Sequence, residues 1–221
     1  MEKVFTYNFS SEPTGTHMLL LGQVPVGSKV LDIGCAAGYL GKYLATEKGC
    51  EMWGVEPEPE MYHTAKQNGY NIVINKNIEE ALSDSSLVGQ RFDILIIGDV
   101  LEHLLFPEKI LFLLKGLIKG GGKLLISLPN VAHYSIRRSL LCGRWNMTDS
   151  GIMDRTHIHF YTLNTAREML EKSGWEIDRV RPRGDLERWF RKIGLERIGK
   201  KILFLFPEFF AVQFIFTARK K

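Results

Sequence analysis

Short apolar runs alternate along the chain with segments whose apolar residues recur at helical spacing. Such runs are typical of strands buried on both faces, and strands that alternate with helices favour a parallel sheet covered on both sides. The expected strands are Lys29–Ile33, Glu51–Val55, Asn71–Ile74, Phe92–Gly98, Lys123–Leu128, Gly174–Arg181 and Phe209–Ala218. The expected helices are Tyr39–Lys48, Glu58–Asn68, Glu108–Ile118, Val131–Cys142 and Leu163–Ser173. The pattern therefore predicts the α/β class, with a doubly wound and mostly parallel sheet.

The turn after the first expected strand carries the clearest binding signal. It runs from Gly34 to Gly38 and leads into a helix that starts at Tyr39. Glycines let a ligand approach the backbone, and a helix N-terminus directs N–H groups and positive dipole charge at it. Ala36 stands where a dinucleotide-binding fingerprint has its second glycine, the residue that admits a pyrophosphate. The turn therefore favours a ligand with a smaller charge.

An acidic residue follows at the end of the second expected strand. Glu56 precedes Pro57, and it lies roughly 20 residues beyond the turn, where a doubly wound fold binds the hydroxyls of a ribose. Asp32 occupies the end of the neighbouring first strand, and no phosphate-binding lysine accompanies the two carboxylates. This combination fits a cationic nucleoside better than a nucleotide, which makes S-adenosylmethionine the favoured ligand.

Four segments together resemble the class I S-adenosylmethionine-dependent methyltransferases, in their order and spacing and over most of the chain. They are VLDIGCAAGYLGKYLA, WGVEPEPEM, FDILIIGDVLEHL and LIKGGGKLLISLPN. The resemblance implies a seven-stranded Rossmann-like fold in which the last strand inserts antiparallel beside its predecessor. The cofactor-binding positions that it implies are Asp32, Gly34, Cys35, Ala36, Gly38, Tyr39, Glu56, Pro57, Asn77, Ile78, Asp99 and Val100.

The resemblance also implies which part of the cofactor each position holds. The turn with Asp32 would hold the methionine portion, Glu56 the ribose hydroxyls, and Asn77 with Ile78 the adenine. Related enzymes usually carry Asp where Asn77 stands. An amide can both donate and accept a hydrogen bond, so an adenine contact stays open, and a helix cap is an equal alternative.

Histidines are the expected catalytic side chains. Methyl transfer from a sulfonium requires alignment of the acceptor and exclusion of water, and an acceptor of high pKa also benefits from a general base. The candidates are His103, at the end of the central strand, and the pair His157 and His159. For His103 two interpretations stay open, a general base and a residue that pins the following loop.

The Asp99-x-x-Glu102-His103 segment raises a second hypothesis. It looks like the Glu-x-x-Glu-His loop that binds a divalent ion in ubiquinone-pathway and small-RNA O-methyltransferases, but Asp99 replaces the first glutamate. If residues 157–159 are extended, both of their imidazoles point to one face and could join such a site. We expect a metal-independent reaction, with an ion held by Asp99, Glu102 and His103 as the alternative.

Residues 143–162 lack periodicity, and long irregular connections of this kind tend to be functional. We interpret them as a lid over the acceptor. Arg155 offers a fork for an anionic or polyhydroxylated acceptor, although pairing with a neighbouring aspartate is an equal alternative. Tyr7 and His133 are the other expected substrate contacts. The run GRWNMTDSGIMDRTHIHFYTLNTAREMLEKSGWEI also resembles the acceptor region of methyltransferases of bacterial cell-surface glycan and glycolipid assembly.

Residues 185–206 interleave aromatic and basic side chains between the last two expected strands. The segment could lie on an anionic membrane surface, and a helical connection that packs on the core with a solvated basic face explains the same pattern. We expect one domain over residues 1–221, with an N-terminal cap segment (1–28), the lid and this basic connection.

Composition sets the remaining expectations. The chain has 221 residues, 45% of them hydrophobic, and a net charge of +4, which is too small to indicate nucleic acid without a localised patch. Three cysteines without metal-type spacing, and no apolar leader, favour a cytoplasmic location, with peripheral membrane contact as an option. We predict O-methylation of a small-molecule, glycan or lipid-linked acceptor. The alternatives are a non-catalytic cofactor-binding module and an RNA methyltransferase, and the oligomeric state does not follow from the sequence.

Overall fold

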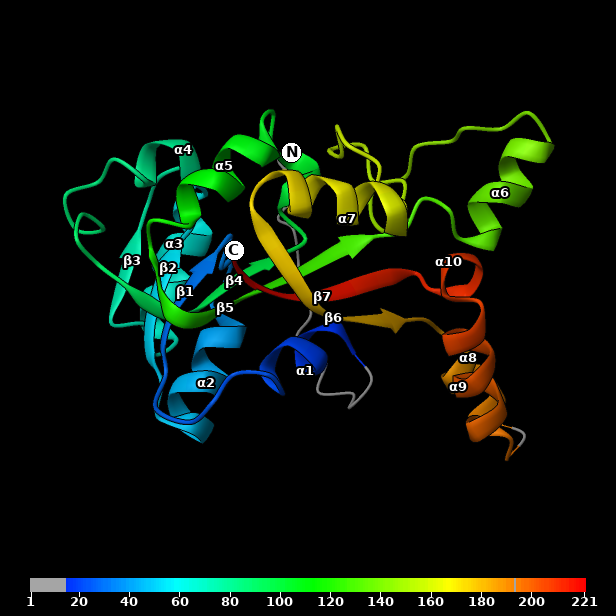
Figure 1. Ribbon diagram of the computed structural model, residues 1–221, viewed down its shortest axis with the longest axis horizontal. Helices are drawn as coiled ribbons and strands as arrows, with labels where there is room; N and C mark the ends of the chain where they lie inside the picture. Colours follow the sequence, from blue (N-terminus) through cyan, green and yellow to red (C-terminus); the bar gives the residue numbers. More distant parts are fainter. Residues whose placement is uncertain (1–14, 193) are drawn as a thin grey trace. The chain divides into compact units, whose positions relative to one another are not determined.

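The computed structural model describes residues 15–192 and 194–221, whose strands form one seven-stranded sheet in the order β3-β2-β1-β4-β5-β7-β6 (Figure 1). The pairs β3–β2, β2–β1 and β1–β4 are parallel, and the pair β6–β7 is antiparallel. This arrangement confirms the predicted fold class. The strands are β1 (Lys29–Ile33), β2 (Glu51–Val55), β3 (Ile72–Ile74), β4 (Phe92–Gly98), β5 (Ile118–Pro129), β6 (Trp175–Arg183) and β7 (Gln213–Lys220).

The helices alternate with these strands along most of the chain. They are α1 (Thr16–Leu21), α2 (Tyr39–Lys48), α3 (Pro59–Gln67), α4 (Ile78–Ala81), α5 (Pro107–Leu114), α6 (Tyr134–Leu141), α7 (Leu163–Lys172), α8 (Leu186–Arg191), α9 (Glu196–Leu205), α10 (Pro207–Phe210) and the 3-10 turn η1 (Leu101–His103). Among the described helices, none is long and apolar enough to span a membrane.

The described chain divides into two compact units. The first contains residues 15–98 and 113–125, and the second contains residues 99–112, 126–192 and 194–221. Strand β5 starts in the first unit and ends in the second. The expected organisation as one domain stays a prediction.

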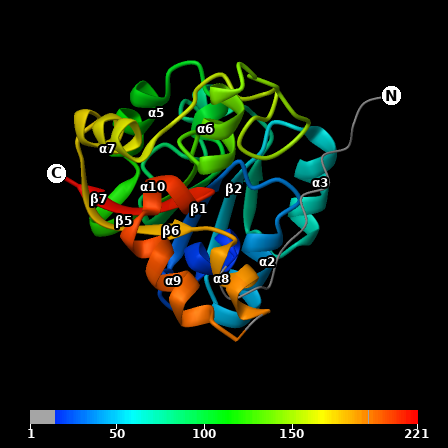
Figure 2. The same cartoon turned by 90° about the vertical axis from the view of Figure 1, so that its right-hand side faces the viewer.

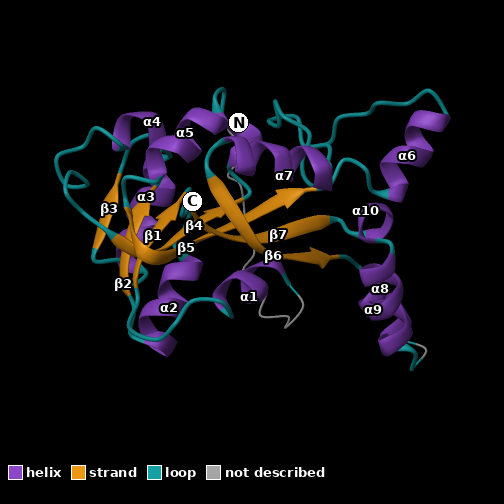
Figure 3. Cartoon of the chain, viewed as in Figure 1, coloured by secondary structure: helices purple, strands orange, loops and turns teal. Residues whose placement is uncertain are grey.

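The first unit is built on the parallel strands β3, β2, β1 and β4, which helices α2 and α3 flank (Figure 3). Strand β1 lies between β2 and β4, with Asp32 opposite Gly54 on one side and Ile96 on the other. From its second residue onward β1 is buried, and so is most of β4. Their continuous apolar runs are therefore those of strands covered on both faces, as the sequence predicts.

The packing around Tyr70 explains why positions 41 and 54 are glycine. The ring is buried, and its hydroxyl donates a hydrogen bond of 2.6 Å to Asp32 Oδ2. A Cβ on Gly41 would lie 2.0 Å from Tyr70 Cε2, and a Cβ on Gly54 would lie 2.7 Å from Cys35 Sγ. Both glycines are therefore required because Tyr70 and Cys35 fill the space where their side chains would lie.

Gly41→Ala should destabilise the protein by about 1–3 kcal/mol because the new methyl group overlaps a buried ring. This loss is opposite in sign to the ~1 kcal/mol by which alanine normally stabilises a helix interior relative to glycine. Urea unfolding measures it, with Gly120→Ala as the matched control, since a Cβ at Gly120 meets no atom within 4 Å. Equal unfolding midpoints for the two variants would contradict this account of Tyr70.

The second unit is built around the antiparallel pair β6 and β7, with Trp175 opposite Lys220 and Arg183 opposite Gln213. The buried Trp175 Nε1 donates to the Leu111 carbonyl oxygen at 2.9 Å. The buried amide of Asn130 donates to the carbonyl oxygens of Glu208 and Ala211. Helices α6, α8, α9 and α10 gather at one end of this unit (Figure 2).

Three expected boundaries are wrong for local reasons. The last strand begins at Gln213, because Pro207 opens the short helix α10 ahead of it. Helix α6 begins at Tyr134, because the side chain of His133 accepts a hydrogen bond from Ser135 N as its N-cap. Strand β5 begins at Ile118 instead of Lys123, so the triple glycine 120–122 lies inside the strand. A Cβ on Gly122 would lie 2.8 Å from the Asp93 carbonyl oxygen, so the close approach of the chain there requires glycine.

Candidate functional site

The glycine-rich turn of the first unit has the backbone conformation that the sequence predicts. Gly34 and Gly38 adopt positive φ angles of 73° and 80°, and Gly38 opens helix α2. The N–H groups of Gly34 and Cys35 donate to the Val55 carbonyl oxygen. Ala36 also has a positive φ, 46°, a conformation that costs energy for a residue with a side chain. The turn is therefore held in a strained conformation by its contacts with the end of β2.

Glu56 provides one of those contacts. Its Oε2 accepts a hydrogen bond of 2.8 Å from Ala36 N, and its Oε1 accepts one of 2.9 Å from Glu58 N. Burial raises the pKa of Glu56. Each carboxylate oxygen has a second lone pair, so both can still accept from the hydroxyls of a ribose. Glu56 is thus able to hold the turn and a ribose at the same time.

Asp32 lies beneath the turn, 1% exposed. Burial raises the pKa of Asp32 to about 7, and the hydrogen bond from Tyr70 opposes this rise. Burial also raises the pKa of the neighbouring Cys35 thiol well above its usual range. The Cys35 thiol therefore stays protonated and apolar at neutral pH, whereas Asp32 titrates near neutral pH.

Asp32 should make stability fall as the pH rises. Its pKa is higher in the folded state than in the unfolded chain, so the folded protein binds the extra proton from about pH 4 to pH 7. The associated stabilisation is complete below the unfolded pKa and is lost as the pH passes the folded one. Asp32→Asn should remove this slope. From pH 5 to pH 8 the free energy of unfolding of the wild type should therefore fall by a few kcal/mol relative to that of the variant. Urea unfolding at both pH values measures the difference, with the exposed Glu60→Gln as control; an unchanged difference would contradict the assignment.

Four further predicted cofactor positions, Tyr39, Pro57, Asn77 and Ile78, lie on the same unit. Asn77 Oδ1 accepts a hydrogen bond of 2.8 Å from Glu80 N as the N-cap of α4, so the alternative role as a cap is observed. Ile78 is buried behind it, and the Pro57 carbonyl accepts a hydrogen bond from Asn75. Tyr39, the first residue of α2, is exposed. An adenine contact through the Asn77 side-chain NH₂ group stays a prediction.

In the second unit the loop from Asp99 to His103 begins with a residue in the left-handed region, Asp99, whose φ is 54°. The Asp99 carboxylate accepts hydrogen bonds from Ser127 Oγ, at 2.9 Å, and from the Gln213 side chain. Val100 then precedes the 3-10 turn. Strands β5 and β7 therefore hold the Asp99 carboxylate, which is not a member of the cluster of potential metal ligands described next.

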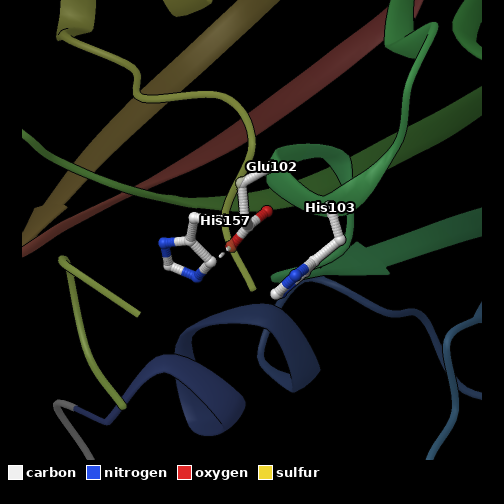
Figure 4. A group of neighbouring side chains, drawn as sticks. All are labelled: Glu102, His103 and His157. Carbon is white, nitrogen blue, oxygen red and sulfur yellow. Dashed lines mark ion pairs between the residues drawn. The ribbon is translucent and has the colours of Figure 1, made fainter. Parts of the chain in front are cut away.

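Glu102, His103 and His157 form that cluster, and their side chains converge in Figure 4. One oxygen or nitrogen atom from each residue lies within 4.8 Å of the others. The Glu102 carbonyl oxygen accepts hydrogen bonds from the N–H groups of Ile158 and His159, which ties the two loops together. His103 Nδ1 donates to the Thr156 carbonyl oxygen at 3.1 Å. The Glu102 backbone and the His103 ring thus hold the segment of residues 156–159, and the same contacts bring His157 to them.

The hydrogen bonds of the two histidines determine which ring nitrogen of each can bind a cation. A carbonyl oxygen can only accept, so His103 Nδ1 and His157 Nδ1, the latter 3.1 Å from the Ile152 carbonyl, both carry protons. In the neutral rings each Nε2 is then a lone-pair donor to a cation. His157 Nε2 lies 3.9 Å from Glu102 Oε1. Both buried oxygens of Glu102 lack a hydrogen-bond partner among the described residues.

The pKa values of Glu102 and His157 are both shifted in the direction that disfavours the charged form. Burial, followed by the charge of Asp99, raises the pKa of Glu102 well above its usual range. Burial, followed by the charge of His103, lowers the pKa of His157. A buried carboxylate without donors is costly. A cation bound to Glu102 and the two Nε2 atoms would remove this cost, so the residues present fit a divalent metal ion.

The remaining predicted residues that the structure describes lie outside the cluster. His159 lies in the same loop, but its buried Nε2 has no hydrogen-bond partner in the described chain, and the residue is not part of the cluster. Arg155 Nε lies 3.3 Å from Asp149 Oδ1 on the surface, which is the paired alternative. His133 is buried at the start of α6, and burial lowers its pKa. Tyr7 lies outside the described residues.

A cavity of about 440 Å³ lies in the second unit, and the carbonyl of Ile152, one of its lining residues, accepts the hydrogen bond from His157 Nδ1. The sequence indicates His133 as a functional residue, but it gives no signal for Ser139 or Ile152. Helix α6, the lid segment and Val212 supply the walls. The lining residues are His133, Ser135, Ile136, Ser139, Arg144, Trp145, Asn146, Thr148, Ile152, Met153 and Val212.

Comparisons with known proteins agree with these features. A family model described as a methyltransferase domain matches residues 13–180. The ubiquinone biosynthesis O-methyltransferase of Cereibacter sphaeroides is 29% identical over 160 residues, 69% of this chain and 62% of the relative. The enzyme of the same name from Coxiella burnetii is 33% identical over 105 residues, 47% of this chain and 44% of the relative. The chain thus spans less than two thirds of the length of these curated relatives.

Solved structures show the same fold. A SAM-dependent methyltransferase from Archaeoglobus fulgidus superimposes with a TM-score of 0.64 at 22% identity, covering 94% of this chain and 95% of its own. A putative methyltransferase from Haloferax volcanii, solved with the activator Trm112, superimposes with a TM-score of 0.63 at 15% identity, covering 91% and 86%. With the family match over residues 13–180, the chain belongs to the class I S-adenosylmethionine-dependent methyltransferases.

Proposed function

We propose that this protein transfers the methyl group of S-adenosylmethionine to a hydroxyl group of a small-molecule, glycan or lipid-linked acceptor. The observation that carries the choice of a hydroxyl is the Glu102, His103 and His157 cluster, which can lower the pKa of an oxygen acceptor. The names of the curated relatives, which are O-methyltransferases, support the same choice. A cytoplasmic location stays a prediction.

The first unit supplies the cofactor contacts. The turn from Gly34 to Gly38, with Asp32 beneath it, would hold the methionine portion. Glu56 would accept hydrogen bonds from the ribose hydroxyls through the lone pairs that Ala36 and Glu58 leave open. Asn77 and Ile78 would line the adenine. These roles follow from the resemblance and are consistent with the observed hydrogen bonds.

The second unit supplies the acceptor contacts. Glu102 and the Nε2 atoms of His103 and His157 would hold a divalent ion, and a bound ion would polarise the acceptor hydroxyl. One carboxylate with two imidazoles suits Mn²⁺, Fe²⁺ or Zn²⁺ better than Mg²⁺, which prefers oxygen ligands. The body of the acceptor would occupy the adjoining cavity, where Arg144 and Trp145 lie on the walls.

Two other functions are weaker. A non-catalytic cofactor-binding module gives no reason for a buried carboxylate and two oriented imidazoles beside a cavity. In an RNA methyltransferase, cations near the acceptor would contact phosphates, and Arg155 of the lid is instead paired with Asp149.

Incubation with methyl-labelled S-adenosylmethionine and fractionated extracts of lipid, glycan, protein and RNA tests the proposal. We expect label in a lipid, glycan or small-molecule fraction, and we expect it to be released by conditions that cleave methyl ethers and to resist those that cleave methyl esters. Label in RNA, or no label from any fraction while S-adenosylhomocysteine binds, would overturn the proposed function.

A further inference from the structure

Helices α6, α8, α9 and α10 lie at one end of the second unit (Figure 2). Large apolar side chains on and beside these helices are exposed. Trp189 on α8 is 61% exposed, Leu205 on α9 is 62% exposed and Leu141 at the end of α6 is 89% exposed. A folded chain rarely places several such side chains together in water unless they meet a partner. We call these residues, with the other exposed side chains of the four helices, the α6–α10 surface. Its other large apolar members are Tyr134, Leu140, Leu195, Ile198, Phe204, Phe206 and Phe209.

Helix α9 shows how the apolar and charged side chains are arranged. Gly199 and Leu203 are its buried residues. At about 100° per residue, Ile198 and Leu205 fall in one exposed sector of the helix. The adjacent exposed sector carries the cations Arg197, Lys200 and Lys201 around Phe204. An exposed apolar stripe bordered by cations is the pattern of a helix that lies at a membrane interface.

The four helices form one continuous surface. Gly199 of α9 packs so closely on α8 that a Cβ would lie 2.9 Å from the Leu186 carbonyl oxygen. The rings of Tyr134 on α6 and Phe209 on α10 are stacked with centroids 5.9 Å apart. The Arg137 guanidinium lies over Phe209 at 5.7 Å. Helix α10 also packs against α9, so contacts link all four helices into one group.

The charges on this surface select the kind of partner. Lys192, Arg197, Lys200 and Lys201 form no ion pair with a carboxylate in the part of the chain that the structure describes, whereas Glu196 pairs with Arg191 at 3.3 Å. Cations at the rim attract anionic lipid headgroups, and Trp and Phe favour the headgroup region. A protein partner would pair these cations with specific carboxylates and would not require them to surround the apolar stripe.

We propose that the α6–α10 surface binds the face of an anionic lipid bilayer. This inference goes beyond the proposed function and is testable without cofactor or acceptor. Ile136 and Ser139 of α6 line the cavity, and Leu140 and Leu141 at the end of the same helix belong to the surface. An acceptor with a lipid tail could therefore remain in the bilayer while its head enters the cavity; this last step rests on the proposed function.

Sedimentation with vesicles of phosphatidylglycerol and phosphatidylcholine, in low salt, tests the proposal on the full chain. The wild type should bind these vesicles and should bind pure phosphatidylcholine vesicles at least tenfold more weakly. Lys200→Gln with Lys201→Gln should weaken binding roughly 25-fold, since each cation near an anionic surface contributes about fivefold. Leu205→Ser with Phe206→Ser should weaken it at least tenfold.

Matched controls are Lys109→Gln and Val88→Ser, which change an exposed cation and an exposed apolar residue outside the surface. Both should bind vesicles as the wild type does, and far-ultraviolet circular dichroism checks that all variants are folded. The proposal is overturned if the four variants bind alike, or if the wild type ignores anionic vesicles. It is also overturned if the surface variants instead abolish a self-association seen by analytical ultracentrifugation, because a second copy would then be the partner.

Discussion

Replacing Glu56 with alanine should weaken the binding of S-adenosylhomocysteine by roughly 100-fold or more. The carboxylate would lose its hydrogen bonds to two ribose hydroxyls, and a hydrogen bond to a charged group contributes about 1.5–3 kcal/mol. The variant also loses the acceptor for Ala36 N, which helps to hold the turn in its strained conformation. Isothermal titration calorimetry near pH 8 measures the affinity.

Two further variants separate these contributions. Glu56→Gln keeps an acceptor for one N–H group and removes the charge, so its affinity should lie between those of the wild type and Glu56→Ala. Glu58→Ala changes the exposed neighbour, whose backbone N–H donates to Glu56 and is unaffected by the substitution. It should bind as the wild type does. Wild-type affinity in Glu56→Ala would show that the turn and the end of β2 do not bind the cofactor.

The arrangement of the first unit could be predicted because its signals are local. The apolar runs of β1 and β4 are those of doubly covered strands, and Glu56 stands at the expected distance from the turn along the chain. Parallel pairing of β1 with β2 then brings the turn and Glu56 together, as the bond from Ala36 N shows. The role of Tyr70 could not be predicted, because nothing in a lone tyrosine before a strand indicates that it fills the space above Gly41.

The second unit could be predicted only in part because its contacts join distant segments. The sequence indicates Asp99, Glu102 and His103 as one group, but hydrogen bonds from Ser127 and Gln213 occupy Asp99, and His157 takes part instead. Choosing between His157 and His159 required the backbone of their loop, where the carbonyl of Ile152 orients one ring. Helix α6 and strand β7 also begin later than the apolar pattern predicts, because His133 caps α6 and Pro207 starts the short helix α10 ahead of β7.

Glu102→Gln and His157→Ala should each reduce the affinity for Mn²⁺ at least tenfold and methyl transfer at least 100-fold. Glu102 is the carboxylate of the cluster and is buried without a donor, so a neutral amide removes the charge that a cation would balance. His157→Ala removes one Nε2 ligand and leaves Glu102 in place. Calorimetric titration with Mn²⁺ and the labelled-methyl assay on the extract fraction that accepts label measure the two effects. Excess chelator should suppress transfer in the wild type, and Mn²⁺ should restore it.

The controls decide whether such losses arise at the cluster. His63→Ala and Glu108→Gln change an exposed histidine and an exposed glutamate elsewhere, and both should keep wild-type Mn²⁺ affinity and transfer. All four variants should bind S-adenosylhomocysteine normally, because none of them changes a residue predicted to contact the cofactor. If the wild type transfers methyl groups fully in excess chelator, the cluster holds no catalytic ion. A loss of activity in Glu102→Gln and His157→Ala would then reflect only the pinning of the 154–159 loop through His103 and Glu102.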